Sequence, residues 1–421
     1  MVRKRYHRVN PKKFIALRAA ADFSSVWRRQ ASRRPRCLPS TRMSIRQPSL
    51  RGTHYPALDG MRGLAILMVV VHNFSFDDAN LSGIAGRLLH ACVIGGWMGV
   101  IMFFVLSGFL ITGILLDTQH EPGHFRRFYL RRTLRIAPLY YAVLLIAFVG
   151  LPLAGTVPAP VRADQPSQVW LWTYLSNWVQ PFGLAGETFP HFWSLAVEEQ
   201  FYLLWPLLTW RQSPETVLRR GLVLAVLAPV VRTAILMRGG TSGMVYLWSP
   251  CRMDALALGG CAAAALRMPG LAAWLQARRK QVLWAAGATL LACPLTCGGV
   301  WSSSFKMQTL GYSLLAIGFT LLLVGLTCAD LAGDARLSVR WWRTAPLRVL
   351  ARYSYGIYVF HKPLQQAVGE PLMQSFGASA IHSTWVNAAY GAAGLAVSLV
   401  LAVLSYHLFE QRFLALRTRV R

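Results

Sequence analysis

Apolar stretches alternate with short basic or polar segments along most of this chain. Ten windows are apolar over roughly the length at which a helix crosses a lipid bilayer, about 20 residues. The first and the ninth carry the most polar residues. The pattern predicts an all-α fold, a polytopic membrane helical bundle of about ten transmembrane helices. The windows are 62–76, 93–116, 136–152, 192–210, 219–238, 253–268, 281–299, 310–328, 349–369 and 386–408.

Loop charges predict the orientation of these helices. The segments before the first window and after each even-numbered one are basic, whereas the other connections have almost no charge bias. By the positive-inside rule, both termini are cytoplasmic. The stretch "VWLWTYLSNWVQPF" (169–182) is excluded from the spans, because counting it would turn every later basic loop outward. We expect it to lie in the outer interface or to re-enter the membrane.

The composition agrees with a membrane protein. Of 421 residues, 54% are hydrophobic and 14% charged, which is more apolar surface than a soluble core could bury. The seven cysteines are scattered, and no Cys/His cluster has metal-ligand spacing, so neither a disulfide framework nor a metal site is expected. Walker and dinucleotide-binding glycine motifs are absent from the sequence.

The net charge of +28 is concentrated at the N-terminus. Residues 1–51 contain 15 Lys and Arg against the single acid Asp22. This segment is predicted to be disordered, and three interpretations stay open: a basic tail on the anionic inner leaflet, an organellar transit peptide, or translation that starts at Met43. A nucleic-acid partner is not expected. The predicted transmembrane domain covers 55–412, and a basic cytoplasmic tail, 413–421, follows it.

Ionisable residues interrupt the apolar windows at few positions. In "LDGMRGLAILMVVVHN" (58–73), Arg62 lies at the inner start of the first helix, and His72 lies ten residues further, about 15 Å deeper. In the fourth window Glu198 shares a helix face with Ser194 and Tyr202. Charged groups inside a bilayer are costly and usually face one another or a wet cavity.

Further polar residues gather toward the same outer half of the bundle. The sixth window begins with Arg252 and Asp254, and the ninth ends with His361 beside Lys362. We interpret Ser194, Tyr202, Arg252, Asp254 and His361 as candidate substrate-binding residues. The candidate catalytic residues are His72, Asn73 and Glu198.

Five blocks in a fixed order carry a resemblance to a known family. They are "LDGMRGLAILMVVVHN", "FFVLSGFLIT" (103–112), "FYLRRTLRIAPLYY" (128–141), "FWSLAVEEQFYLLWPLL" (192–208) and "YSYGIYVFHKPL" (353–364). Together they resemble membrane-bound acyltransferase family 3 over roughly residues 55–412. The resemblance implies an enzyme of a bacterial inner membrane that moves an acyl group, with acetyl expected, from cytoplasmic acyl-CoA to a hydroxyl of a glycan, lipid-linked sugar or small exported metabolite. Acyl-CoA is then a donor substrate, and no bound cofactor is implied.

One spacing departs from the family pattern. The family has ten residues between the arginine and the histidine of the first helix, whereas nine separate Arg62 from His72. At about 100° per residue, the family spacing returns the histidine to within about 20° of the arginine's face. Here Asn73 holds that position, and His72 points about 80° away. A local bulge could restore the register, or both residues could line one cavity.

Acyl transfer to a hydroxyl requires a base, donors for the developing oxyanion and a site for the thioester. His72 suits the base, because histidine titrates near neutral pH, and Glu198 could fix its tautomer. The donor is expected to enter from the inside. The arginines expected to bind its phosphates are Arg62, Arg131, Arg132 and Arg135, of which Arg132 and Arg135 match the family's paired arginines.

Each of these residues also has a structural interpretation. The arginines of 131–135 could act only as positive-inside anchors, and His361 could extend to the membrane surface. The glycines of "GGWMGVIMFFVLSGFL" favour close helix packing, and Ser107 favours an interhelical hydrogen bond over a nucleophilic role. Two other functions stay open: a transporter or flippase of a glycan or lipid intermediate, and a catalytically inactive sensor.

Overall fold

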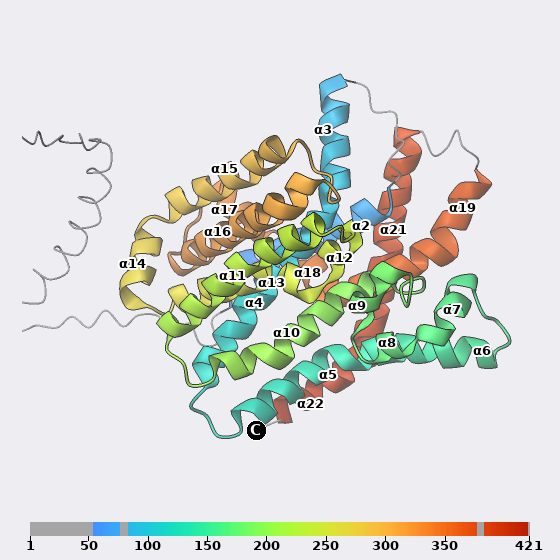
Figure 1. Cartoon of the computed structure of the whole chain (residues 1–421), viewed down its shortest axis with the longest axis horizontal. Helices are drawn as coiled ribbons and strands as arrows, with labels where there is room; N and C mark the ends of the chain where they lie inside the picture. Colours follow the sequence, from blue (N-terminus) through green and yellow to red (C-terminus); the bar gives the residue numbers. More distant parts are fainter. Residues whose placement is uncertain (1–53, 76–82, 377–382, 420–421) are drawn as a thin grey trace, which may run out of the picture. The chain divides into compact units, whose positions relative to one another are not determined.

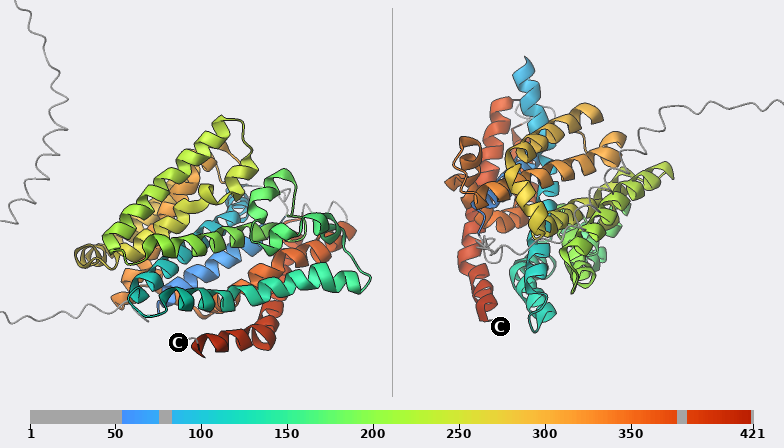
Figure 2. Two further views of the ribbon diagram at one scale, coloured as in Figure 1. Left: turned by 60° about the horizontal axis from the view of Figure 1, so that its bottom comes forward. Right: turned by 90° about the vertical axis from the view of Figure 1, so that its left-hand side faces the viewer.

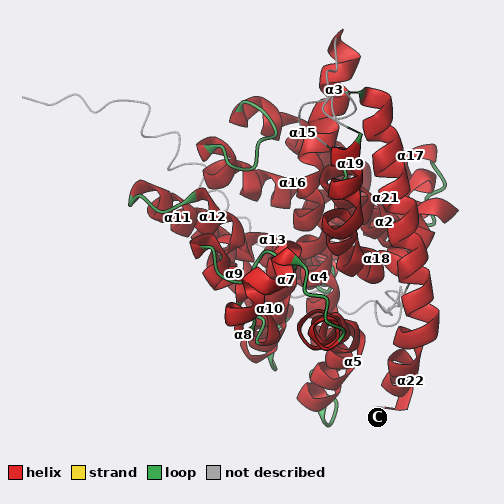
Figure 3. Ribbon diagram, turned by 90° about the vertical axis from the view of Figure 1, so that its right-hand side faces the viewer, coloured by secondary structure: helices red, strands yellow, loops and turns green. Residues whose placement is uncertain are grey.

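The computed structural model describes residues 54–75, 83–376 and 383–419, and every regular element in these ranges is a helix (Figure 3). The chain divides into two units, 1–49 and 50–421, of which only the second is described. The all-α prediction is therefore confirmed for this part of the chain. The predicted disorder of 1–51 concerns residues outside it.

Each of the ten apolar windows falls wholly or largely within a helix (Figure 1). Shorter helices connect them or extend from their ends. The main helices are α2 (Pro56–Asn73), α3 (Gly83–Ile94), α4 (Met98–Thr118), α5 (His124–Leu145), α10 (Trp193–Thr209), α11 (Pro214–Met237), α13 (Ser249–Ala265), α15 (Arg279–Cys297), α16 (Tyr312–Leu331), α18 (Ala345–Leu364), α21 (Thr384–Ser405) and α22 (Gln411–Arg419). The short ones are α6 (Leu151–Leu153), α7 (Ala159–Asp164), α8 (Val169–Trp172), α9 (Ser176–Val179), α12 (Ser242–Leu247), α14 (Pro269–Ala277), α17 (Leu337–Arg340) and α19 (Glu370–Ser375).

Several helices meet the requirements of a membrane span by length and apolarity. Within the described ranges there are five such stretches, or six if Ser242–Ala265 and Pro269–Ala277, which are bent by 99°, form one broken span. The five are Leu89–Thr118, His124–Leu153, Pro214–Met237, Met307–Leu331 and Trp385–Arg417. Apolar side chains such as Val223, Val226 and Val230 of α11 point outward, as expected for a lipid-facing surface. The figure of ten spans remains a prediction.

The aromatic stretch 169–182 folds into the short helices α8 and α9 and a 3-10 turn. None of these elements is long enough to cross a membrane. Gln200 of α10 fastens the stretch, because its amide nitrogen donates to the carbonyl oxygen of Tyr174 (2.8 Å) and to Oδ1 of Asn177 (2.9 Å). The stretch thus packs against α10 instead of adding a span to the bundle.

Glycines allow the central helices α2, α4 and α13 to approach at backbone distance. A Cβ at Gly99 would lie 2.5 Å from the carbonyl oxygen of Ala65, and one at Gly108 would lie 1.9 Å from that of Leu256. Conversely, a Cβ at Gly259 of α13 would lie 2.1 Å from the carbonyl oxygen of Val105. The prediction that the glycines of the second window serve helix packing is therefore confirmed.

Replacing Gly108 with alanine is expected to destabilise the bundle by about 1–3 kcal/mol, because α4 and α13 must separate to admit the methyl group. The measurement is the melting temperature of the purified protein in detergent. Gly287 of α15 is the matched control, since no atom lies within 4 Å of a Cβ built there. Gly287→Ala should leave the melting temperature unchanged or raise it, because alanine favours a helix over glycine by about 1 kcal/mol. Equal melting temperatures for Gly108→Ala and the wild type would contradict the packing argument.

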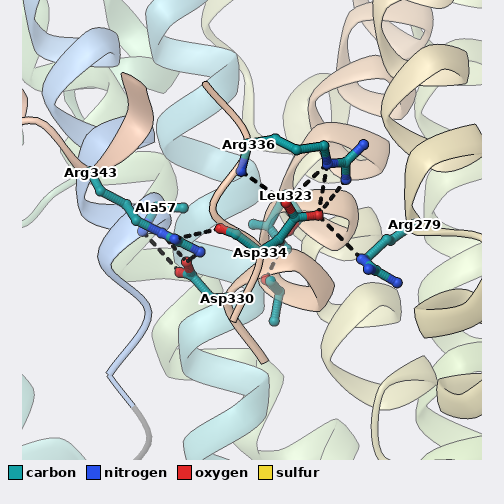
Figure 4. A network of polar contacts seen from close by, with 8 residues as sticks. Ala57, Arg279, Leu323, Asp330, Asp334, Arg336 and Arg343 are labelled. Atoms are coloured by element: carbon teal, nitrogen blue, oxygen red, sulfur yellow. Dashed lines mark hydrogen bonds and ion pairs between the residues drawn. The ribbon is translucent and has the colours of Figure 1, made fainter. Parts of the chain in front are cut away.

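An ionic network joins the start of α2 to the segment after α16 (Figure 4). The Asp330 carboxylate accepts from the backbone N–H of Ala57 (2.9 Å) and from Nε of Arg343 (2.8 Å). Next to it, hydrogen bonds from Arg336, with a weaker contribution from Arg279, hold the pKa of Asp334 well below its usual value. The network fixes the end of α2 that carries Arg62.

Candidate functional site

A cavity of about 750 Å³ lies between α2, α4, α5, α10, α18 and α22. One face of α4 lines it at helical spacing, through Val100, Phe104, Ser107, Ile114 and Thr118. From the first to the last of these residues is about 27 Å at the usual helical rise. The cavity is therefore long enough to hold a ligand in an extended conformation, and its length is close to the thickness of the hydrocarbon core of a bilayer, about 30 Å.

Arginines dominate the end of the cavity near the α4–α5 turn. Six arginines and three acids contribute to the lining. Two of the acids are paired, Asp117 with Arg267 (2.6 Å) and Glu121 with Arg127 (3.1 Å). The lining arginines are Arg62, Arg127, Arg131, Arg132, Arg135 and Arg417.

The sequence predicts four of these arginines, and α5 accounts for three of them. Arg131, Arg132 and Arg135 occupy neighbouring positions of α5, and the Arg132 guanidinium lies over the Tyr202 ring, 5.3 Å from its centroid. Within the described ranges, Arg62, Arg132 and Arg135 have no carboxylate within 4 Å. This end of the cavity therefore holds excess positive charge suited to an anionic ligand.

Glu198 provides the third acid, further along the cavity. Its two carboxylate oxygens accept hydrogen bonds from Oγ of Ser107 on α4 (2.8 Å) and from the hydroxyl of Tyr202 on α10 (3.0 Å). All three residues line the cavity. Ser107 is thus the interhelical hydrogen-bonder that the sequence predicts. The carboxylate of Glu198 is held by hydroxyl groups, with no hydrogen bond to His72.

The other end of the cavity lies between α10 and α18. Ser194 and Tyr358 line it there, and their hydroxyl oxygens are 2.6 Å apart. The Tyr358 hydroxyl is also 2.7 Å from the carbonyl oxygen of His191, to which it donates. Ser194, Glu198 and Tyr202 therefore form one polar stripe of α10 along the cavity, as their spacing predicts.

His72 and Asn73 lie beyond this end and outside the cavity lining. His72 packs against Gly96, one helical turn before Val100 on α4, and its Nδ1 lies 3.2 Å from the carbonyl oxygen of Val93. The Asn73 amide donates to the carbonyl oxygen of Val69 in the preceding turn (2.8 Å). Because α2 is a regular α-helix from Arg62 to Asn73, no bulge restores the family register.

Arg252 and Asp254 both lie outside the cavity lining. They are only two positions apart in the sequence but have different environments. Asp254 forms a buried ion pair with Arg232 (2.8 Å) and accepts from Ser313 (2.7 Å). Arg252 is 2% exposed, and its guanidinium lies 4.4–5.9 Å from four ring centroids. The four rings belong to Phe104, Trp193, Tyr246 and Tyr312.

His361 lies in the interior of the bundle, which contradicts its interpretation as a residue that extends to the membrane surface. Its side chain is fully buried, and its ring centroid lies 4.9 Å from that of His191. The physical reason is its position on α18, where it follows the buried residues Ser354 and Tyr358 on the same helix face. His361 therefore adjoins the end of the cavity between α10 and α18 without lining it.

The sequence did not single out three residues of the site. Arg127 and Arg417 complete the cationic end, and Tyr358 lines the other. Arg417 belongs to α22, which packs beside α5 (Figures 1 and 2). The sequence predicts a basic tail for residues 413–421, and the short apolar run "FLAL" is the sequence feature that could have indicated this helix. Within the described ranges, no group of three or more His, Cys, Asp or Glu residues could hold a metal ion.

Several known proteins are similar in sequence to this chain. The chain is 29% identical over 329 residues to the peptidoglycan O-acetyltransferase OatA of Listeria monocytogenes. That match covers 74% of this chain and 49% of the Listeria protein. It is 29% identical over 381 residues to the putative peptidoglycan O-acetyltransferase YrhL of Bacillus subtilis. That match covers 85% of this chain and 54% of YrhL. It is 24% identical over 330 residues to the O-acetyltransferase OatA of Staphylococcus aureus. That match covers 74% of this chain and 50% of the relative.

The chain thus spans about half the length of the curated relatives that it matches. No solved structure matches it. The model of a family described as an acyltransferase domain, acyltransferase family 3, matches residues 55–407, which include all five blocks and the whole cavity-lining part of α2, α4, α5, α10 and α18. The resemblance is confirmed, and the chain belongs to this acyltransferase family.

Proposed function

We propose that this protein is an integral membrane O-acyltransferase that moves an acetyl group from acetyl-CoA to a hydroxyl of a glycan. The observation that carries the proposal is the long cavity with excess arginines at one end and the hydroxyl-bound Glu198 carboxylate further in. Coenzyme A has the matching form, because its phosphates lie at one end of a long chain and its thioester at the other. The cavity would bind the phosphates at the arginines and direct the thioester toward Ser194 and Tyr358.

The acceptor belongs to the opposite side of the membrane in this proposal. The named relatives act on peptidoglycan, a glycan rich in hydroxyl groups, and a lipid-linked or diffusible sugar offers the same chemistry. Arg252 and Asp254 belong to the first two turns of α13, and Arg252 lies over the rings of Phe104 on α4 and Trp193 at the start of α10. We propose that they support the acceptor side of the site and that the acceptor arrives next to Ser194.

The reaction needs a group that takes the proton of the acceptor hydroxyl. The sequence predicts His72 for this role, with Asn73 beside it and Glu198 as the second catalytic residue. His72 packs one helical turn beyond the cavity end, against Gly96. The acceptor oxygen would attack the thioester carbon, and the thiolate of coenzyme A would leave with the proton. Ser107 and Tyr202 would keep the Glu198 carboxylate oriented into the cavity.

The orientation in the membrane follows from the loop charges. We propose ten spans with both termini in the cytoplasm, in a bacterial inner membrane, because the basic segments then lie inside. The cationic end of the cavity lies near the α4–α5 turn, beside "FRRFYLRRTLR". In this orientation the arginines open toward the compartment where acyl-CoA is made.

The test is transfer of label from radiolabelled acetyl-CoA in membranes that contain the wild-type protein, with peptidoglycan fragments and host glycans as acceptors. Labelled, alkali-labile ester on a glycan supports the proposal. Binding of acetyl-CoA with no labelled product on any acceptor would instead indicate an inactive sensor. Absence of acetyl-CoA binding would favour a transporter.

Arg417→Ala is expected to weaken acetyl-CoA binding by about tenfold, because one charge-assisted hydrogen bond to a phosphate contributes about 1.5–3 kcal/mol and Arg417 is partly solvated. The measurement is the dissociation constant of radiolabelled acetyl-CoA on purified protein. Arg412 is the matched control, since it belongs to the same helix but is exposed and outside the cavity lining. An equal affinity for Arg417→Ala and Arg412→Ala would remove α22 from the donor site.

A further inference from the structure

The helices α10 and α18 line one end of the cavity, and a histidine lies near each of the lining residues Ser194 and Tyr358. On α18, His361 follows the lining residue Tyr358 by three positions, so both lie on one helix face. Before α10, His191 precedes the lining residue Ser194 by three positions. The two imidazole rings meet edge to face, with centroids 4.9 Å apart and planes at 73°. The two histidines therefore lie next to the hydroxyl groups of Ser194 and Tyr358, at this end of the cavity.

The hydrogen bonds of His361 leave one nitrogen available. Its Nδ1 is 2.6 Å from the carbonyl oxygen of Tyr358, and only an N–H can donate to a carbonyl oxygen. In the neutral ring, Nε2 therefore carries the lone pair. This Nε2 is buried and has no hydrogen-bond partner among the described residues. Unpaired buried polar atoms are rare, because such an atom loses its hydration without replacement.

The surroundings hold the pair in place on both sides. The buried Asp164 carboxylate accepts from the backbone N–H groups of Gly186 (2.9 Å), Glu187 (3.1 Å) and Thr188 (2.7 Å) in the loop that leads to His191. The carbonyl oxygen of His191 accepts from Tyr358. An imidazole with a fixed tautomer and an unpaired Nε2, packed against the cavity-lining residue Tyr358, has the features of a general base.

We propose that the acceptor hydroxyl enters between α10 and α18 and that Nε2 of His361 takes its proton. The inference rests on the proposed function and changes one feature of it, the identity of the base. The acceptor oxygen forms a bond to the thioester carbon while its O–H bond breaks toward Nε2. The C–S bond then breaks, its electron pair leaves on the coenzyme A thiolate, and the thiolate takes the proton from the imidazolium. His191 acts as a positioning residue that supports the His361 ring.

His72 and His361 both lie outside the cavity lining, and they differ in their neighbours. The Nδ1 of His72 lies beside the carbonyl oxygen of Val93, at the α3 side of α2, and the residue does not line the cavity. His361 adjoins Tyr358, which does. The acceptor class that fits is a neutral sugar hydroxyl, because Ser194 and Tyr358, the lining residues next to the pair, present only hydroxyl groups.

The experiment compares His361→Gln with the exposed control His120→Gln as purified proteins. Radiolabelled acetyl-CoA gives the donor dissociation constant, and transfer to peptidoglycan fragments gives kcat and KM. We expect His361→Gln to lower kcat about 100-fold, as for loss of a general base, with donor affinity within twofold of the wild type. His120→Gln should match the wild type in both measurements.

A kcat for His361→Gln within about threefold of the wild type, while the wild type transfers label, would overturn this inference and leave the proposed function intact. Absence of transfer by the wild type would overturn both. If His361→Gln does not fold, His191→Gln takes its place, because it keeps the base but removes the ring that supports it. His191→Gln should then lower kcat about tenfold and leave the donor affinity unchanged. A kcat of His191→Gln equal to that of the wild type would overturn the inference.

Discussion

Glu198→Gln is expected to lower the rate of acetyl transfer by roughly 10² to 10⁴, the range that acid–base groups contribute to enzymatic rates. Glu198 is the one cavity-lining carboxylate in the described structure that has no arginine partner within 4 Å, and two hydroxyl groups hold it. Glutamine has nearly the same shape and keeps a carbonyl oxygen that can accept one of these bonds. The fold and the acetyl-CoA affinity should therefore stay close to those of the wild type, while the charge is lost.

Glu199→Gln is the matched control for this experiment. Glu199 is the next residue of α10 and does not line the cavity. We expect it to retain transfer within a few-fold of the wild type, because Glu199 does not line the cavity. Similar losses in both variants would mean that negative charge on this part of α10 stabilises the bundle and has no specific role in the reaction. The comparison is made at saturating acetyl-CoA, so that kcat and not binding is measured.

The helices could be predicted from apolar length, because a membrane span must satisfy its backbone hydrogen bonds internally. Each predicted window falls wholly or largely within a helix for this reason, and the aromatic stretch 169–182 contains only short helices. The number of spans could not be settled this way. The helices α2, α10 and α18 are short or carry many polar residues, since one side of each faces the cavity and not lipid.

Cavity residues that share one helix were easier to predict than those that reach the cavity through packing between helices. Arg131, Arg132, Arg135 and Glu198 lie within single helices, where residue spacing determines the shared face. Arg417 and Tyr358 reach the cavity only through the packing of α22 and α18, which the sequence pattern does not specify. The roles of His72 and Asn73 remain predictions.

Arg132→Ala combined with Arg135→Ala is expected to weaken acetyl-CoA binding on the order of 100- to 10,000-fold, because each charge-assisted hydrogen bond to a phosphate contributes about 1.5–3 kcal/mol. Both arginines line the cationic end and have no carboxylate within 4 Å in the described part of the chain. Two unpaired positive charges so close together repel each other, and a bound phosphate would relieve that repulsion. The measurement is the dissociation constant of radiolabelled acetyl-CoA at two salt concentrations.

The salt dependence separates phosphate recognition from an anchoring role at the membrane surface. If the arginines bind phosphate, wild-type affinity falls as salt rises, and the double variant loses most of that dependence because its charges are gone. Arg126→Ala is the control, because Arg126 lies on α5 but is exposed and outside this cavity. An unchanged affinity in the double variant would limit these arginines to fixing the orientation of α5. It would also leave the excess charge of the cavity without a ligand, which would remove the main argument for a coenzyme A donor.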